Sequence, residues 1–93
     1  YIFPDSNSRY LTDEDLSGYS SDQLELAKNE IYARHGRKFV TQRIADYFNS
    51  KSWYKGTVEP ETFDADTSVF NEYEVANIQK IADMEGKLRS EGK

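Results

Sequence analysis

Apolar positions recur with a helical period over three stretches of the chain. The first covers residues 21–35, where four side chains share one stripe at about 100° per residue: Leu24, Ala27, Ile31 and His35. Leu26 and Ala33 lie on nearly the opposite side of the same helix. Because a helix that is apolar on two sides is usually covered on two sides, we expect helix 21–35 to be central in the fold.

Local signals mark both ends of this helix. Ser20 and Gln23 stand at the spacing of a capping box, and Tyr19 and Leu24 flank the cap as a hydrophobic staple would. Gly36 is predicted to take the left-handed conformation that commonly follows the last residue of a helix. The sequence therefore specifies where this helix begins and ends as well as which faces it buries.

The second periodic stretch is a shorter helix, predicted over residues 42–50. Thr41 is its candidate N-cap. Ile44, Tyr47 and Phe48 follow the i, i+3, i+4 spacing of a helix with one apolar face. We therefore expect this helix to pack its aromatic side against the rest of the fold.

The third stretch is the last helix, which we expect to be ordered to about residue 88 and to fray over 90–93. Asn71 and Glu74 have the spacing of a capping box, and Phe70 with Val75 is expected to form its staple. Its apolar stripe is predicted to hold five side chains: Val75, Ile78, Ile81, Ala82 and Leu88.

The remaining segments are predicted to be mainly irregular. Residues 1–11 form an extended lead-in that anchors a few apolar side chains. Thr12 and Asp15 have capping spacing, which favours one or two helical turns at about 13–17. Residues 56–70 are predicted to be a partly packed loop with one helical turn near 60–63.

Together these elements predict an all-α fold. We expect a small orthogonal array of about four short helices around the central helix that ends at Gly36, with an irregular N-terminal lead-in and a long loop before the last helix. A chain of 93 residues is enough for a single domain, 1–93, with one modest core, and we expect the ordered part to cover about 8–88. Because the chain opens on Tyr1 without a Met, we expect it to be excised from a longer protein.

Composition predicts a core rich in aromatic residues. Only 37% of the residues are hydrophobic but 14% are aromatic, so many tyrosine hydroxyls must reach the rim or a partner. Phe39 is expected to point inward from a short extended connector. We expect Trp53 to close the core and Tyr54 to lie at the rim; the alternative is that this pair forms an aromatic platform for a sugar or a peptide.

Charge is unevenly distributed along the chain. The net charge is −5, yet residues 28–55 carry seven Lys or Arg against two acids, and the remainder carries five against fifteen. The overall acidity argues against nucleic-acid binding. The basic middle forms a patch that attracts anions, meets the acidic segments within the fold, or is simply solvated. The chain has no Cys, which excludes disulfides and thiolate metal sites, and no apolar run long enough to span a membrane.

Arg34 and His35, at the end of helix 21–35, are the residues that most suggest chemistry. The chain has no Cys nucleophile and no Ser or Asp at a recognised motif spacing, so we predict no enzyme and no catalytic role for His35. The single His is not clustered with carboxylates, and we predict no metal and no cofactor. We interpret Arg34 and His35 as side chains that cap carbonyls and join helices, with a ligand site as the alternative.

The stretch Tyr32–Gly36 reads Tyr-Ala-Arg-His-Gly, and with its surroundings the sequence resembles the YARHG domain family of bacteria. The resemblance extends over about 8–88 and includes the lead-in over 8–11, the run over 27–31 and two aromatic pairs, Tyr47-Phe48 and Trp53-Tyr54. It implies an extracellular domain of Gram-positive-type bacteria, found in lipoproteins and multidomain surface proteins, without assigned enzymatic activity. The family has no settled ligand, so the resemblance implies no functional residue.

We hypothesise a non-catalytic interaction module at the bacterial surface that recognises a cell-envelope polymer, a peptide or a neighbouring protein. A basic, aromatic strip suits an anionic polymer such as teichoic acid. We expect Arg37 and Lys38 to be exposed, because they follow the helix stop. The candidate ligand-binding residues are Arg34, His35, Arg37, Lys38, Lys51, Trp53, Tyr54 and Lys55.

Two other functions stay open, a structural spacer domain without a ligand and a cell-wall hydrolase that uses paired carboxylates. The hydrolase is disfavoured, because the acids cluster in a solvated stretch and none stands in an apolar run. We expect a monomer with no nucleic-acid partner.

Overall fold

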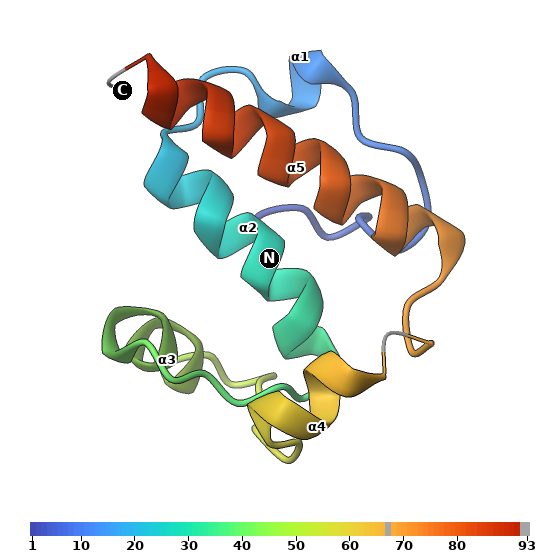
Figure 1. Cartoon of the computed structure of the whole chain (residues 1–93), viewed down its shortest axis with the longest axis vertical. Coiled ribbons are helices and arrows are strands. Elements are labelled where there is room, and N and C mark those ends of the chain that lie inside the picture. The colour runs from blue at the N-terminus through green and yellow to red at the C-terminus, as the bar shows by residue number, and fades with distance from the viewer. Residues whose placement is uncertain (67, 92–93) are drawn as a thin grey trace. The chain divides into compact units, whose positions relative to one another are not determined.

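The structure, a computed structural model, describes residues 1–66 and 68–91 (Figure 1). It confirms the all-α prediction, and the described residues form α2 and four further helices, in agreement with the expected number of about four helices besides the central one. Within the described residues there is no β-strand, and Arg37 and Val58 form one isolated parallel bridge. In chain order the helices are α1 (Asp13–Leu16), α2 (Ser21–Arg34), α3 (Gln42–Asn49), α4 (Pro60–Ala65) and α5 (Glu72–Ser90).

The chain forms two compact units. The first unit comprises Tyr1–Ile31 and Phe70–Lys93, and the second unit comprises Tyr32–Val69. The division falls within α2, just before the Tyr-Ala-Arg-His-Gly stretch. α5 continues to Ser90, beyond the predicted limit at 88, and the last two residues of the segment expected to fray lie outside the described residues.

In the first unit, α2 and α5 lie side by side and run in opposite directions (Figure 1). Arg89 near the end of α5 pairs with Asp22 at the start of α2, and Lys28 pairs with Glu85 at 3.0 Å. Aliphatic side chains dominate the core of this unit. The buried cluster comprises Phe3, Leu11, Leu16, Leu24, Ala27, Ile31 and Ile81.

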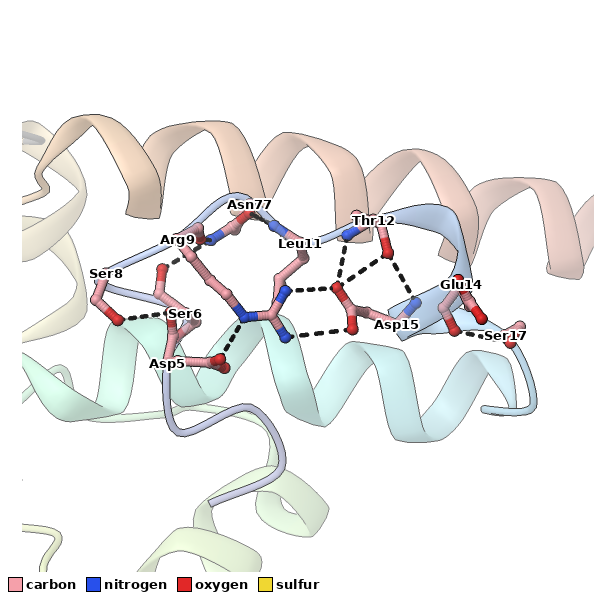
Figure 2. A network of polar contacts seen from close by, with 10 residues as sticks. All are labelled: Asp5, Ser6, Ser8, Arg9, Leu11, Thr12, Glu14, Asp15, Ser17 and Asn77. Atoms are coloured by element: carbon pink, nitrogen blue, oxygen red, sulfur yellow. Dashed lines mark hydrogen bonds and ion pairs between the residues drawn. The ribbon is translucent and has the colours of Figure 1, made fainter.

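Polar side chains fasten the N-terminal lead-in to both long helices of this unit. Asn77 of α5 is 1% exposed; its amide oxygen accepts the N–H of Leu11 at 2.8 Å, and its amide nitrogen donates to the carbonyls of Ser6 and Arg9 (Figure 2). Glu30 of α2 is also buried, and its carboxylate accepts the backbone N–H groups of Ile2 and Phe3. An irregular segment is thus held in place because its backbone groups find side-chain partners.

A second group of contacts stiffens the start of α1. The guanidinium of Arg9 pairs with Asp5 and donates two hydrogen bonds to Asp15, at 2.8 and 3.2 Å (Figure 2). The Asp15 carboxylate also accepts the N–H of Thr12, while the Thr12 hydroxyl accepts the N–H of Asp15. These hydrogen bonds confirm the capping box predicted for this helix.

The other capping predictions have mixed outcomes. The reciprocal hydrogen bonds of Ser20 with Gln23, and of Asn71 with Glu74, are both present. Thr41 precedes α3 as predicted, but its hydroxyl makes no cap hydrogen bond.

The predicted apolar stripe of α5 is wrong at Val75, which is 54% exposed. The buried face of this helix is turned relative to the predicted stripe and mixes polar with apolar residues. Its buried members are Glu74, Asn77, Ile81 and Glu85.

The second unit is organised around the end of α2. The helix ends at Arg34, one residue earlier than predicted, and His35 lies in the turn that follows. Gly36 has a φ of 89°, which confirms the predicted left-handed conformation. A Cβ on Gly36 would lie 2.8 Å from Oγ1 of Thr57. Glycine is therefore needed here both for its backbone conformation and for the close approach of the loop at Thr57.

Candidate functional site

Aromatic rings form the body of the second unit. The ring of Phe48 is fully buried in α3 and stacks on Phe39, with centroids 5.0 Å apart. Tyr47, Trp53 and Tyr54 also contact the Phe48 ring. The predicted inward position of Phe39 and the buried stripe of α3 are thereby confirmed.

Trp53 and Tyr54 do not divide between core and rim as predicted. Both side chains are half-buried, and both rings pack against Phe48. The Tyr54 hydroxyl donates a hydrogen bond of 2.6 Å to the carbonyl of Arg37, and burial raises the pKa of this phenol. The prediction failed because adjacent residues in an irregular turn do not alternate as they would in a strand.

Gly56 allows the Tyr54 ring to sit where it does. A Cβ at this position would lie 2.6 Å from the Tyr54 hydroxyl oxygen and 3.2 Å from Cγ of Lys38. Since contacts under about 3 Å force neighbouring atoms to move, any larger residue would displace the tyrosine or the lysine stem. The loop from Trp53 to Val58 is therefore shaped by two glycines, Gly36 beneath it and Gly56 within it.

A hollow of about 280 Å³ opens beside Tyr54. α3 contributes Ala45 and Asn49, which are four residues apart and so lie on one face of the helix. The remaining walls come from the connector after Gly36 and from the loop around Tyr54. We call this site the Tyr54 hollow, and its lining residues are Lys38, Phe39, Ala45, Asn49, Tyr54 and Gly56.

The cations expected to form an anion-binding strip are partly neutralised. Arg37 donates two hydrogen bonds of 3.0 Å to Asp64, and these hold the pKa of the Asp64 carboxyl below its usual range. Lys38 forms a 2.7 Å ion pair with Glu59, which raises the pKa of the amine. Lys38 is exposed as predicted, but the Arg37 side chain is only 18% exposed, because it also lies over the Phe39 ring.

The other two lysines among the candidates differ from each other. The amine of Lys51 lies 4.5 Å from the centre of the Tyr47 ring, in a cation–π contact. Lys55 is exposed, and within the described part of the chain its side chain has no ion-pair partner. These candidate cations therefore make separate contacts, and Lys55 is exposed to solvent.

Arg34 and His35 are half-buried at the end of α2. The N–H of His35 donates to the carbonyl of Tyr32 at 3.1 Å, and the N–H of Gly36 donates to Ala33 at 2.9 Å. Neither Arg34 nor His35 lines the Tyr54 hollow. The structural role predicted for Arg34 and His35 stays a prediction, as does the alternative that they bind a ligand.

Of the eight candidate residues, the hollow contains Lys38 and Tyr54. Sequence reasoning missed Ala45, Asn49 and Gly56 as lining residues, and it assigned Phe39 to the core alone. The available signal was the i, i+4 pair Ala45 and Asn49, which shares the helix face next to Tyr47 and Phe48. This pair indicates a binding site only when the position of the loop around Tyr54 next to that helix face is also known.

The first unit carries a larger groove of about 410 Å³ beside α5, lined by more charged residues than the Tyr54 hollow. Its charged residues partly cancel, since Lys80 pairs with Asp13 at 2.7 Å. Its lining residues are Asp13, Lys80, Asp83, Met84 and Lys87. Among the described residues no group of three or more His, Cys, Asp or Glu side chains is arranged to hold a metal ion. None of the described helices is both long and apolar enough to cross a membrane.

Comparison with known protein families identifies a match. The model of the YARHG domain family matches residues 1–86, which is most of the 93-residue chain and includes both units. No curated protein and no solved structure matches the chain. The family resemblance seen in the sequence is confirmed.

Proposed function

The chain belongs to the YARHG domain family, and on that premise we propose that it is a non-catalytic interaction module. Domains of this family are generally extracellular in bacteria. The module would be carried by a surface protein or lipoprotein and would recognise a component of the cell envelope, a polymer or a protein. Recognition would take place at the Tyr54 hollow of the second unit.

The observation that carries this proposal is the construction of the hollow. Ligand sites are typically concave, with apolar or aromatic walls and a few polar groups that fix orientation. The hollow combines the rings of Phe39 and Tyr54 with the amide of Asn49 and the amine of Lys38. Tyr54 is fixed by its hydrogen bond to Arg37, and Phe39 by stacking on Phe48, so the site is formed before any ligand arrives.

The carboxyls whose pKa values are clearly shifted support a role without catalysis, because their pKa values are lowered and not raised. A general acid for glycoside cleavage needs a carboxyl whose pKa is raised. Five aspartates have pKa values that are instead lowered, chiefly by hydrogen bonds from neighbouring side chains: Asp5, Asp13, Asp15, Asp64 and Asp66. These groups stay ionised at neutral pH and are held in structural contacts.

Binding of the chain to purified Gram-positive cell walls tests the proposal. We expect the wild type to be retained, and Ala45→Leu to lose retention because the larger side chain fills the hollow. Ala65→Leu is the matched control, since Ala65 is an exposed helical residue of the same unit. Equal retention of the two variants, both with a native melting curve, would contradict the assignment of the site.

The basic strip provides a second arm of the same experiment. Arg37 and Lys38 already have acidic partners, which leaves Lys51 and Lys55 as the cations to test. Because neither of these lysines lines the hollow, we expect the double variant Lys51→Ala with Lys55→Ala to retain wall binding. Binding that disappears in this variant and weakens steeply with salt would assign recognition to the lysines rather than the hollow.

A further inference from the structure

The Tyr54 hollow has a size and a charge balance that select its ligand. We propose that the unit that enters it is a single uncharged sugar ring, a neutral hexose or N-acetylhexosamine residue of an envelope glycan. This inference rests on the proposed function and names the ligand class for the same site. It departs from the anionic polymer suggested by the basic sequence.

The volume of the Tyr54 hollow suits a ligand of one small ring. Sites for drug-sized molecules occupy roughly 300–1,000 Å³, whereas this hollow holds about 280 Å³. Ala45 and Gly56 contribute almost no side chain to the lining, which leaves space between α3 and the loop. A single six-membered ring fills such a space, and the rest of a glycan would extend into solvent.

Charge disfavours an anion in the hollow. Among the described residues that line the hollow, Lys38 alone is charged, and its amine forms an ion pair with Glu59 at 2.7 Å. A phosphate or carboxylate would have to break this ion pair or approach Glu59 itself, and either event costs binding energy. An uncharged ligand leaves the pair intact.

The polar groups of the hollow match hydroxyls. The Asn49 amide carries both donors and acceptors, and its side chain has no hydrogen-bond partner elsewhere in the described chain. A sugar hydroxyl, which both donates and accepts, pairs with such an amide. The aromatic ring of Tyr54 meanwhile suits the C–H groups of a sugar ring, which are weakly positive.

The backbone next to the hollow argues against a bound peptide strand. The N–H of Lys38 donates to Val58, and the carbonyl of Gly36 accepts the N–H groups of Thr57 and Val58. These groups are consumed by the bridge between Arg37 and Val58, so they are closed to the main-chain pairing on which strand addition depends. An apolar peptide side chain would also leave the Asn49 amide desolvated without a partner.

Saturation-transfer NMR with three small probes tests the proposal on the intact chain. We expect N-acetylglucosamine to bind with a millimolar dissociation constant that is insensitive to salt, as one small uncharged ring allows. Glycerol phosphate and trialanine should give no transfer. Asn49→Leu should weaken sugar binding roughly tenfold and Ala45→Leu should abolish it, whereas the control Ala65→Leu should bind like the wild type.

The outcomes separate this inference from the proposed function. Binding of glycerol phosphate or trialanine in place of the sugar, lost in Ala45→Leu, would overturn the ligand class and keep the site. If the protein binds cell walls through the hollow but does not bind the sugar, the assignment of a sugar ligand is equally wrong. If the sugar binds as well to Ala45→Leu as to the wild type, the hollow is not the site and both claims are wrong.

Discussion

The two units solve the problem of a small core in different ways. The first unit buries aliphatic side chains, and two of its buried polar residues, Asn77 and Glu30, form hydrogen bonds with the backbone of its own lead-in. The second unit is built from aromatic rings, and among its described residues Phe48 and Phe63 are the buried ones. Its half-buried rings, Phe39, Trp53 and Tyr54, leave surfaces that the unit itself does not cover.

This difference suggests a division between stability and recognition. Aromatic side chains with a polar group are suited to sites where one side is apolar and the other is wet, whereas aliphatic cores leave no such surface. The hydrogen bonds of the first unit connect residues of that unit to one another, as those of Asn77 do. We therefore expect substitutions in the first unit to change stability, and substitutions at the Tyr54 hollow to change binding.

The largest effect should come from the centre of the aromatic unit. Phe48→Ala removes the ring against which Phe39, Trp53 and Tyr54 pack, and we expect a loss of about 3–5 kcal/mol in the free energy of unfolding. Urea denaturation followed by Trp53 fluorescence measures it. Val40→Ala, at an 82% exposed position of the same unit, should change stability by no more than ~0.5 kcal/mol.

The next effect concerns the polar fastening of the first unit. Asn77→Leu removes the hydrogen bonds that the amide makes to the N–H of Leu11 and to the carbonyls of Ser6 and Arg9, and we expect a loss of about 2 kcal/mol. The same replacement at Gln79, an exposed residue of α5, is the control. Equal denaturation midpoints for the two variants would mean that the lead-in is not held by Asn77.

The two glycines with positive φ allow a direct comparison of the units. Gly18 has a φ of 86° and nothing near its missing side chain, so Gly18→Ala should cost about 1 kcal/mol for conformation alone. Gly36→Ala adds the contact with Thr57 and should cost about 2 kcal/mol. In a Thr57→Ala background, which removes the nearest atom, the cost of Gly36→Ala should fall towards that of Gly18→Ala.

The smallest effect is the pH dependence of the exposed ion pairs. Hydrogen bonds from Arg9 lower the pKa of Asp15 below its unfolded value, so the stabilisation is present above about pH 4 and is lost as the pH falls through the folded pKa. We expect the melting temperature of Asp15→Asn to fall less on acidification than that of the wild type. Salt should weaken the effect, because the pair is exposed and easily screened.

What the sequence could predict was local. The capping boxes and Gly36 were correct because each depends on residues within about four positions. Asn77 was not recognised as buried, because its partners are backbone groups of a segment 66 to 71 residues away that has no periodicity.

The site was only partly predictable for the same reason. Tyr54 and Lys38 were named as candidates, but the partner of Lys38 is Glu59 and that of Arg37 is Asp64, both contributed by the later loop and α4. Charge counted along the sequence therefore overstated the positive potential of this region. A hollow formed by one helix and two loops exists only once these segments have folded together.

Mapping where envelope material contacts the chain tests most directly whether the Tyr54 hollow is the recognition site. Backbone amide spectra of the labelled protein would be recorded with solubilised cell-wall fragments. We expect saturable shifts centred on Ala45, Asn49 and Gly56, with the amides around Asp13 and Lys87 unchanged. Shifts confined to the groove of the first unit, with the Tyr54 hollow unaffected, would contradict it.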